Sequence, residues 1–70
     1  MTMDVAARAR LLKETSEHHD GYEKVAPAHD WWDWYAAYMD AREDGRTPEE
    51  ADAAAGHYMT DVKDVRVASV

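Results

Sequence analysis

Five of the seven aromatic side chains lie in one short segment, and this concentration limits the folds open to the chain. The segment over residues 29–44 reads HDWWDWYAAYMDARED and holds all three tryptophans. Elsewhere burial capacity is low, because isoleucine and phenylalanine are absent and leucine plus valine make only eight of the 70 residues. We therefore expect a single small domain over residues 1–70 whose core is built by aromatic side chains.

The sequence contains no cysteine, which removes several ways of stabilising a small domain. Disulfides, cysteine-based zinc sites, iron–sulfur clusters and thiol catalysis are all excluded. A domain of this size usually needs support beyond one hydrophobic core. Three sources remain: a metal held by histidines and carboxylates, association with another chain, or very good packing.

The net charge is -7, and both halves of the chain are acidic. No basic face is present to neutralise phosphates, so binding to nucleic acid or to an anionic membrane is disfavoured. No apolar run approaches the length of a membrane span or of a signal-peptide core. We expect a cytoplasmic protein.

Turn and capping signals divide the chain into three helical segments. Asp4 is a candidate N-cap, and Thr47 with Pro48 and Glu50 forms a capping box. Whether the first helix continues through Gly21 is left open. The expected helices cover residues 4–20, 28–44 and 48–65, before a tail over 66–70. The last residues, VRVASV, are compatible with a short strand, a helix tail or an arm to a partner. These signals predict an all-α, up-down-up bundle of three short helices, which oligomerisation completes.

Helical spacing predicts which faces are buried. The first helix has a thin stripe, flanked by a second row of residues; the stripe comprises Val5, Ala9, Leu12, Ser16 and His19, and the row comprises Leu11, Thr15, His18 and Tyr22. The third helix has an apolar face whose small residues allow close approach; it comprises Ala51, Ala54, Ala55, Tyr58, Met59, Val62 and Val65.

The apolar arc of the second helix spans roughly 160°, which is wider than the ~100° stripe that a surface helix needs. We therefore expect this helix to be covered from two sides. Tryptophan and tyrosine are the residues that anchor protein interfaces. The sequence thus predicts an acidic assembly protein that binds a second copy or a helical protein partner. The expected interface residues are Trp31, Trp32, Trp34, Tyr35, Tyr38, Met39, Tyr58 and Val62.

An alternative function is binding of a divalent transition metal by histidines and carboxylates. His19 and Glu23 are four residues apart, as are His29 and Asp33, so each pair would share a helix face. The two pairs could meet where the first two helices connect, and His18 is a further candidate ligand. On the competing interpretation, His19 is a hydrogen-bonded core residue, and His18, His29 and His57 are solvated surface groups or caps.

A third hypothesis is an aromatic pocket for a planar or cationic small molecule, in a module related to drug resistance. No nucleophile, oxyanion-hole loop or phosphate-binding loop accompanies the acidic and histidine side chains. We therefore expect no enzymatic activity from the chain alone, and the assembly function requires no cofactor.

A resemblance to a known group of sequences covers about residues 17–59. It rests on the runs HDWWDWY, GRTPEEA and GHYM. On these runs the chain resembles a short bacterial helical sequence that occurs alone or beside glyoxalase/bleomycin-resistance-type domains. Those domains are built from βαβββ units and bind metal or drug between sheets. Because nothing in this sequence supplies such strands, the resemblance implies no binding residue here.

Overall fold

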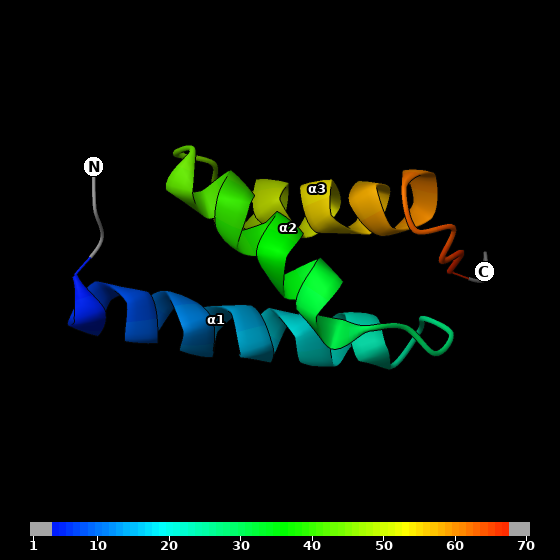
Figure 1. The fold of residues 1–70 in the computed structure, drawn as a ribbon, viewed down its shortest axis with the longest axis horizontal. Helices are drawn as coiled ribbons and strands as arrows, with labels where there is room; N and C mark the ends of the chain where they lie inside the picture. Colours follow the sequence, from blue (N-terminus) through cyan, green and yellow to red (C-terminus); the bar gives the residue numbers. More distant parts are fainter. Residues whose placement is uncertain (1–3, 68–70) are drawn as a thin grey trace.

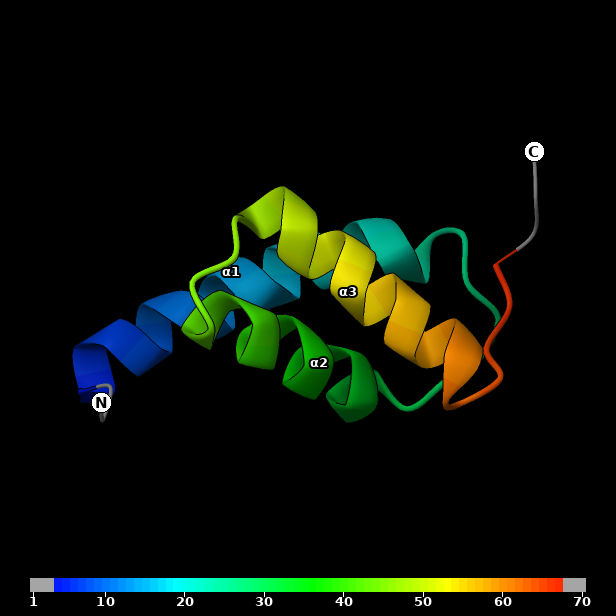
Figure 2. The same cartoon turned by 90° about the horizontal axis from the view of Figure 1, so that it is seen from above.

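The computed structural model describes residues 4–67, which form three helices and no strand. The helices are α1 (Val5–Glu23), α2 (Trp31–Glu43) and α3 (Pro48–Asp61). They run up, down and up, and α2 crosses between α1 and α3 (Figures 1 and 2). The all-α three-helix prediction is confirmed. Residues 68–70 of the expected tail lie outside the described residues.

Helix α1 is longer than the predicted 4–20 segment. Asp4 is its N-cap, as expected, and its Oδ1 accepts a hydrogen bond of 2.7 Å from the backbone N–H of Ala7. The helix then continues through Gly21 to Glu23. A single exposed glycine weakens a helix by about 1 kcal/mol relative to alanine, which is too little to end one. The backbone N–H of Lys24 closes the last turn on the carbonyl of Tyr22.

Helix α2 is shorter than the predicted 28–44 segment, because it begins only at Trp31 after the N-cap Asp30. Its end agrees with the sequence signal at Gly45. That glycine has φ +91°, and the N–H of Arg46 donates to the carbonyl of Ala41 while the N–H of Gly45 donates to that of Arg42. This pair of bonds is a Schellman motif, which needs a left-handed residue at the glycine position.

Helix α3 begins as predicted but ends before residue 65. The hydroxyl of Thr47 accepts from the N–H of Glu50, whose carboxylate accepts in turn from the N–H of Thr47. The helix stops at Asp61, and the left-handed Asp64 (φ 58°) then reverses the chain. This reversal lets the N–H of Val65 donate to the carbonyl of Met59, so Val65 packs on the core from outside the helix.

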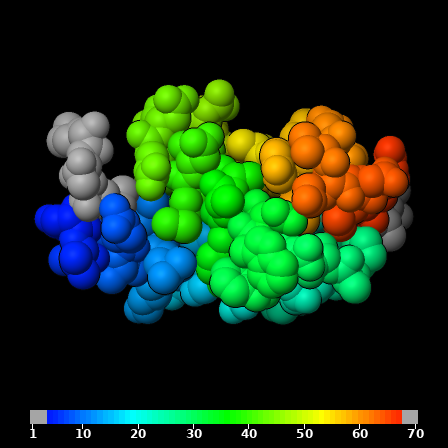
Figure 3. Space-filling view, in the orientation of Figure 1, coloured from blue at the N-terminus to red at the C-terminus, as the bar shows by residue number. Residues whose placement is uncertain are grey.

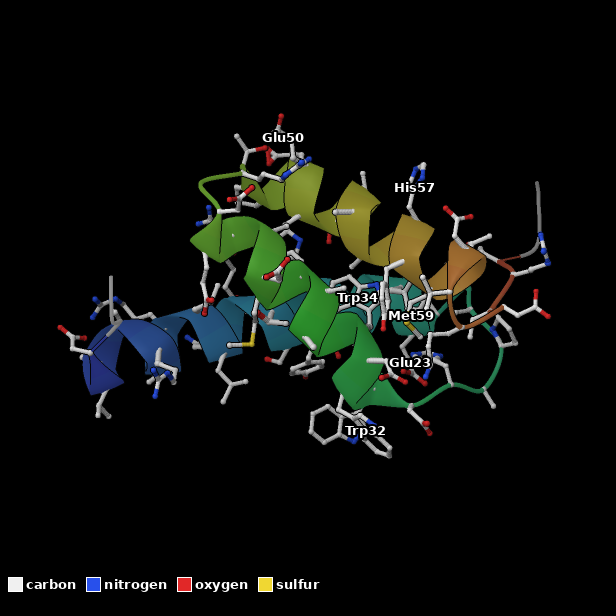
Figure 4. The ribbon with its side chains drawn as sticks, turned by 45° about the horizontal axis from the view of Figure 1, so that its top comes forward. Glu23, Trp32, Trp34, Glu50, His57 and Met59 are labelled. Atoms are coloured by element: carbon white, nitrogen blue, oxygen red, sulfur yellow. The ribbon has the colours of Figure 1, made fainter. Side chains whose placement is uncertain are left out.

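The core lies where α2 contacts both other helices. Trp34 and Tyr38 are 1% and 0% exposed and stack with ring centroids 5.2 Å apart. Ala51, Ala55 and Met59 of α3 close on them without any exposed surface. Figure 4 shows Trp34 and Met59 between the helices, and Figure 3 shows the atoms of α2 between those of α1 and α3. The expectation that α2 is covered from two sides is confirmed.

The face of α1 that enters the core differs from the predicted stripe. Leu11, Thr15 and His19 are buried, whereas Val5 and Leu12 are 83% and 48% exposed. The flanking row thus supplies most of the core contact, and the Thr15 hydroxyl is satisfied by the Leu11 carbonyl at 2.6 Å. The first turns of α1 also extend beyond α2 and α3 (Figures 1 and 2), so within residues 4–67 these turns have no helix packed against them.

A polar network joins α1 to both neighbours at the edge of the core. Oε2 of Glu14 accepts from the Tyr38 hydroxyl at 2.5 Å and from Arg42 Nε at 2.8 Å. One turn later, His18 Nδ1 lies 2.7 Å from Oδ2 of Asp52 on α3. The Arg42 guanidinium, above all, holds the pKa of Glu14 below its usual value, against a smaller opposing effect of burial. Burial and the Glu14 carboxylate raise the pKa of Tyr38 well above its usual value.

Among residues 4–67, no helix is both long enough and apolar enough to span a bilayer.

Two glycine substitutions should change stability in opposite directions. Gly21 lies inside α1 with nothing within 4 Å of an added Cβ, so Gly21→Ala should raise stability by about 1 kcal/mol and the Tm by about 4–8 °C. Gly45→Ala should instead lower stability by about 1–2 kcal/mol, because a Cβ is strained at φ +91°. Thermal unfolding followed by circular dichroism measures both. Destabilisation by Gly21→Ala would show that α1 does not run through residue 21.

The Glu14 network should make the fold sensitive to acid. The folded pKa of Glu14 lies below its unfolded value, so its stabilising contribution is complete above about pH 4.3 and is lost as pH falls through the folded pKa. Glu14→Gln should cost roughly 1–2 kcal/mol at pH 7, and should flatten the loss of stability between pH 6 and 3. Urea unfolding across this range measures both effects. The matched control is Glu17→Gln, at an exposed position on the same helix; equal acid slopes for the two variants would contradict the prediction.

Candidate metal centre and adjoining groove

Three potential metal ligands meet where α1 leads into the connection to α2. His19 and Glu23 lie one turn apart on α1, and His29 comes from the connection. The first two share a helix face because α1 stays regular through Gly21. His29 can turn back toward α1 because α2 does not begin until Trp31. The two local deviations from the predicted helix bounds therefore assemble the cluster.

The donor atoms of this cluster form a small triangle. His19 Nε2 lies 3.0 Å from His29 Nε2, and Oε2 of Glu23 lies 3.4 Å from the former and 3.5 Å from the latter. A tetrahedral zinc ion with bonds of 2.0–2.2 Å separates its ligands by about 3.3–3.6 Å. The three atoms thus lie close to the spacing that one metal ion imposes.

Burial differs sharply between the three side chains. The side chain of His29 is fully buried and that of His19 is 8% exposed, whereas that of Glu23 is 60% exposed. A metal ion here would lie between two imidazoles on the protein side and one carboxylate on the solvent side. Its remaining coordination positions would therefore lie toward solvent.

The backbone sets the tautomer of His29. Its Nδ1 lies 2.7 Å from the carbonyl oxygen of Pro27, which can only accept, so Nδ1 carries the proton and donates. In the neutral ring Nε2 is then unprotonated and faces His19. Metal-bound histidines usually donate their second ring N–H to a carbonyl or carboxylate in this way. Through this carbonyl, Pro27 orients a potential metal ligand.

An aromatic layer surrounds the two histidines. The ring of His19 lies 5.4 Å from Trp34 and 5.2 Å from Tyr35, and the ring of His29 lies 5.0 Å from Tyr22. Burial in this layer lowers the pKa of His19, although Glu23 acts in the opposite direction. The imidazole is accordingly favoured in the neutral form, which is the form that binds metals.

The structure does not place two of the five predicted ligands in the cluster. Asp33 lies on α2 and its Oδ2 is 3.4 Å from Lys63 Nζ. It was predicted to share a helix face with His29, but His29 precedes α2, so this pairing was wrong. His18 lies on another side of α1 and forms a hydrogen bond with Asp52 instead. The competing interpretation of His29 as a solvated surface group does not hold, because its side chain is fully buried.

The predicted interface residues separate into buried and exposed groups. Trp34 and Tyr38 lie in the core of the single chain and present no surface to a partner in this fold. Tyr35 and Met39 are partly buried against that core. The exposed members are Trp31 (52%), Trp32 (53%), Tyr58 (37%) and Val62 (63%). Figure 4 shows Trp32 projecting away from the helices.

A shallow groove adjoins the histidine cluster. Its volume is about 680 Å³, and its lining comprises Ala9, Leu12, Lys13, Ser16, His19 and Glu23 of α1 with Trp31 and Tyr35 of α2. His19 and Glu23 belong to both the groove and the cluster. The α1 side includes Ala9, Leu12 and Ser16 of the stripe first expected to be core. The stripe was thus visible in the sequence, but its residues were expected to be buried in the core and not to line a groove.

Comparison with known protein families, with characterised proteins and with solved structures finds no match for this chain. The resemblance to sequences found beside glyoxalase-type domains therefore stays a prediction.

Proposed function

We propose that this protein binds one divalent transition metal ion, Zn²⁺ in particular, through His19, Glu23 and His29. The observation that carries the proposal is the triangle of two Nε2 atoms and one Oε2 atom with sides of 3.0, 3.4 and 3.5 Å. Two imidazoles and one carboxylate suit zinc and other transition metals that keep an open coordination position.

The surroundings of the triangle support the same function. The Pro27 carbonyl orients His29, and burial favours neutral His19. The carboxylate of Glu23 would offset one of the two positive charges of the ion. His29 thus has the tautomer that metal binding needs and Glu23 supplies a negative charge, while His19 would release the Nε2 proton that it donates to His29.

A metal ion would also supply the support that a cysteine-free domain of this size lacks. It would join α1 to the connection before α2, where the backbone has only local turns to hold it. Because the ligands converge only in the folded chain, binding energy would add to folding stability. This links the proposed function to the size of the protein.

A second candidate function is self-association or binding of a helical partner through exposed aromatic residues. The specific observation is the pair Trp31 and Trp32, which are about half exposed and contact each other edge-on at 5.5 Å. Exposed tryptophans are often interface anchors. Trp34 and Tyr38 have no part in this candidate, because they are already buried within the chain. A location in the cytoplasm belongs to both proposals as an expectation.

Removing one ligand should abolish tight metal binding without unfolding the chain. Glu23 is the best position to change, because its side chain is mostly exposed. Glu23→Gln should weaken Zn²⁺ binding by about 100-fold or more, since even loss of a residue that only orients a ligand costs about 10–100-fold. Competition with a chromophoric chelator measures the affinity. The matched control Glu17→Gln, on an exposed part of the same helix, should bind as the unaltered chain does.

Zn²⁺ should stabilise the fold through the same residues. At 100 times the Kd, the ion should add about 2.7 kcal/mol, which raises the Tm of a domain of this size by roughly 10–20 °C. His29→Gln should remove this rise, whereas His57→Gln should keep it, because His57 is exposed and points away from the other helices (Figure 4). An equal Tm rise in both histidine variants would contradict the proposed site.

If the protein self-associates through its exposed tryptophans, changing one of them should reduce the mass of the assembly. Trp32→Ser should lower the subunit number seen by native mass spectrometry, while leaving the circular dichroism spectrum and Zn²⁺ affinity unchanged, because Trp32 lies outside both the core and the groove. Glu17→Gln again serves as the surface control. A monomer in the unaltered protein at every concentration would refute self-association.

A further inference from the structure

We propose that the bound metal and the adjoining groove together form a site for a small aromatic carboxylic acid. This inference rests on the proposed metal function and names the class of ligand that the metal would accept. The carboxylate would coordinate the ion, and the ring would lie in the groove against Trp31 and Tyr35.

A metal ion held by this cluster would have an open coordination position. The described chain supplies three donor atoms, and a four-coordinate zinc site of this kind takes its fourth ligand from water or a small molecule. That ligand cannot approach from the side of His29, whose side chain is fully buried. It must approach from the side of Glu23, where the groove begins. His19 and Glu23 line the groove, so a molecule lying there reaches the ion directly.

The groove has aromatic side chains on α2 and an aliphatic one on α1. On α2, the rings of Trp31 and Tyr35 lie 4.9 Å apart at an interplanar angle of 71°, and Tyr35 continues to His19 at 5.2 Å. Leu12 forms the opposite wall and is 48% exposed. Two aromatic rings facing a leucine favour a flat apolar group, which could stack on one ring and contact the edge of the other. The volume of about 680 Å³ is in the range of small-molecule sites.

The charge around the groove indicates which ligand would suit it. The charged side chains that line the groove, apart from histidine, are Glu23 and Lys13. With a divalent ion bound and both histidines neutral, the charges of the ion, Glu23 and Lys13 add up to a positive value. The whole chain, by contrast, carries -7. The site would thus be a local positive region on an acidic protein, and a single negative charge would complement it. An oxygen donor with one negative charge is a carboxylate, which is also a good zinc ligand.

The experiment uses the full chain loaded with Co²⁺, whose visible absorption reports the coordination of the ion. Phenylacetate, acetate and phenylacetamide are titrated separately, and the affinity of each is also measured by calorimetry. Phenylacetate should bind about tenfold or more tightly than acetate, because only its ring contacts the groove. Phenylacetate and acetate should both change the Co²⁺ spectrum. Phenylacetamide should leave the spectrum unchanged, since it lacks the anionic donor.

Two tryptophan variants test the role of the groove. Trp31→Ala should reduce the affinity for phenylacetate to about that for acetate, while the affinities for acetate and for Co²⁺ stay unchanged. Trp32→Ala is the matched control, because Trp32 is equally exposed and adjacent but does not line the groove. It should retain the preference for phenylacetate.

Two outcomes separate failure of this inference from failure of the proposed function. If the chain binds Co²⁺ but phenylacetate is no tighter than acetate, or Trp31→Ala and Trp32→Ala act alike, the inference is overturned and the metal site stands. If the chain takes up no Co²⁺, the proposed function is overturned and this inference with it.

Discussion

The stacked pair of Trp34 and Tyr38 holds the three helices in place. Both rings come from α2, are buried almost completely, and lie between α1 and α3. A chain with so few aliphatic side chains can fill a core only if large rings meet small partners, and Ala51 and Ala55 of α3 provide them. The hydroxyl of Tyr38 remains at the core edge, where Glu14 accepts its hydrogen bond. One tyrosine thus serves both the apolar core and the polar network beside it.

The candidate metal centre depends on this packing. His19 lies against Trp34 and Tyr35, so the rings of α2 determine how deeply the first ligand is buried. The connection then turns so that His29 meets His19, held by the Pro27 carbonyl. Two imidazoles in contact inside an aromatic layer lie next to a solvent-facing carboxylate, and this arrangement is the basis of the proposed metal site. The same layer extends outward as the wall of the groove.

Much of the fold could be predicted from local sequence signals. The caps at Asp4 and Thr47 and the stop at Gly45 agree with the structure, because each acts through hydrogen bonds or backbone angles within a few residues. The side-chain cluster was predicted in part. His19 with Glu23 follows from helical spacing, whereas the partner of His29 was placed on the wrong residue, because the start of α2 depends on how the connection folds back.

The sequence alone determined the helical class, the number of helices and the dependence on aromatic burial, since capping acts locally and few other side chains were large enough to fill a core. Only the tertiary structure decided which row of α1 faces the core, which tryptophans are buried and which histidines meet. Neighbouring rows on one helix are only about 100° apart around the helix axis. The sequence also does not distinguish a tryptophan that will be buried from one three residues away that will be exposed. Packing against the other helices is what distinguishes them, and that contact exists only after the chain has folded.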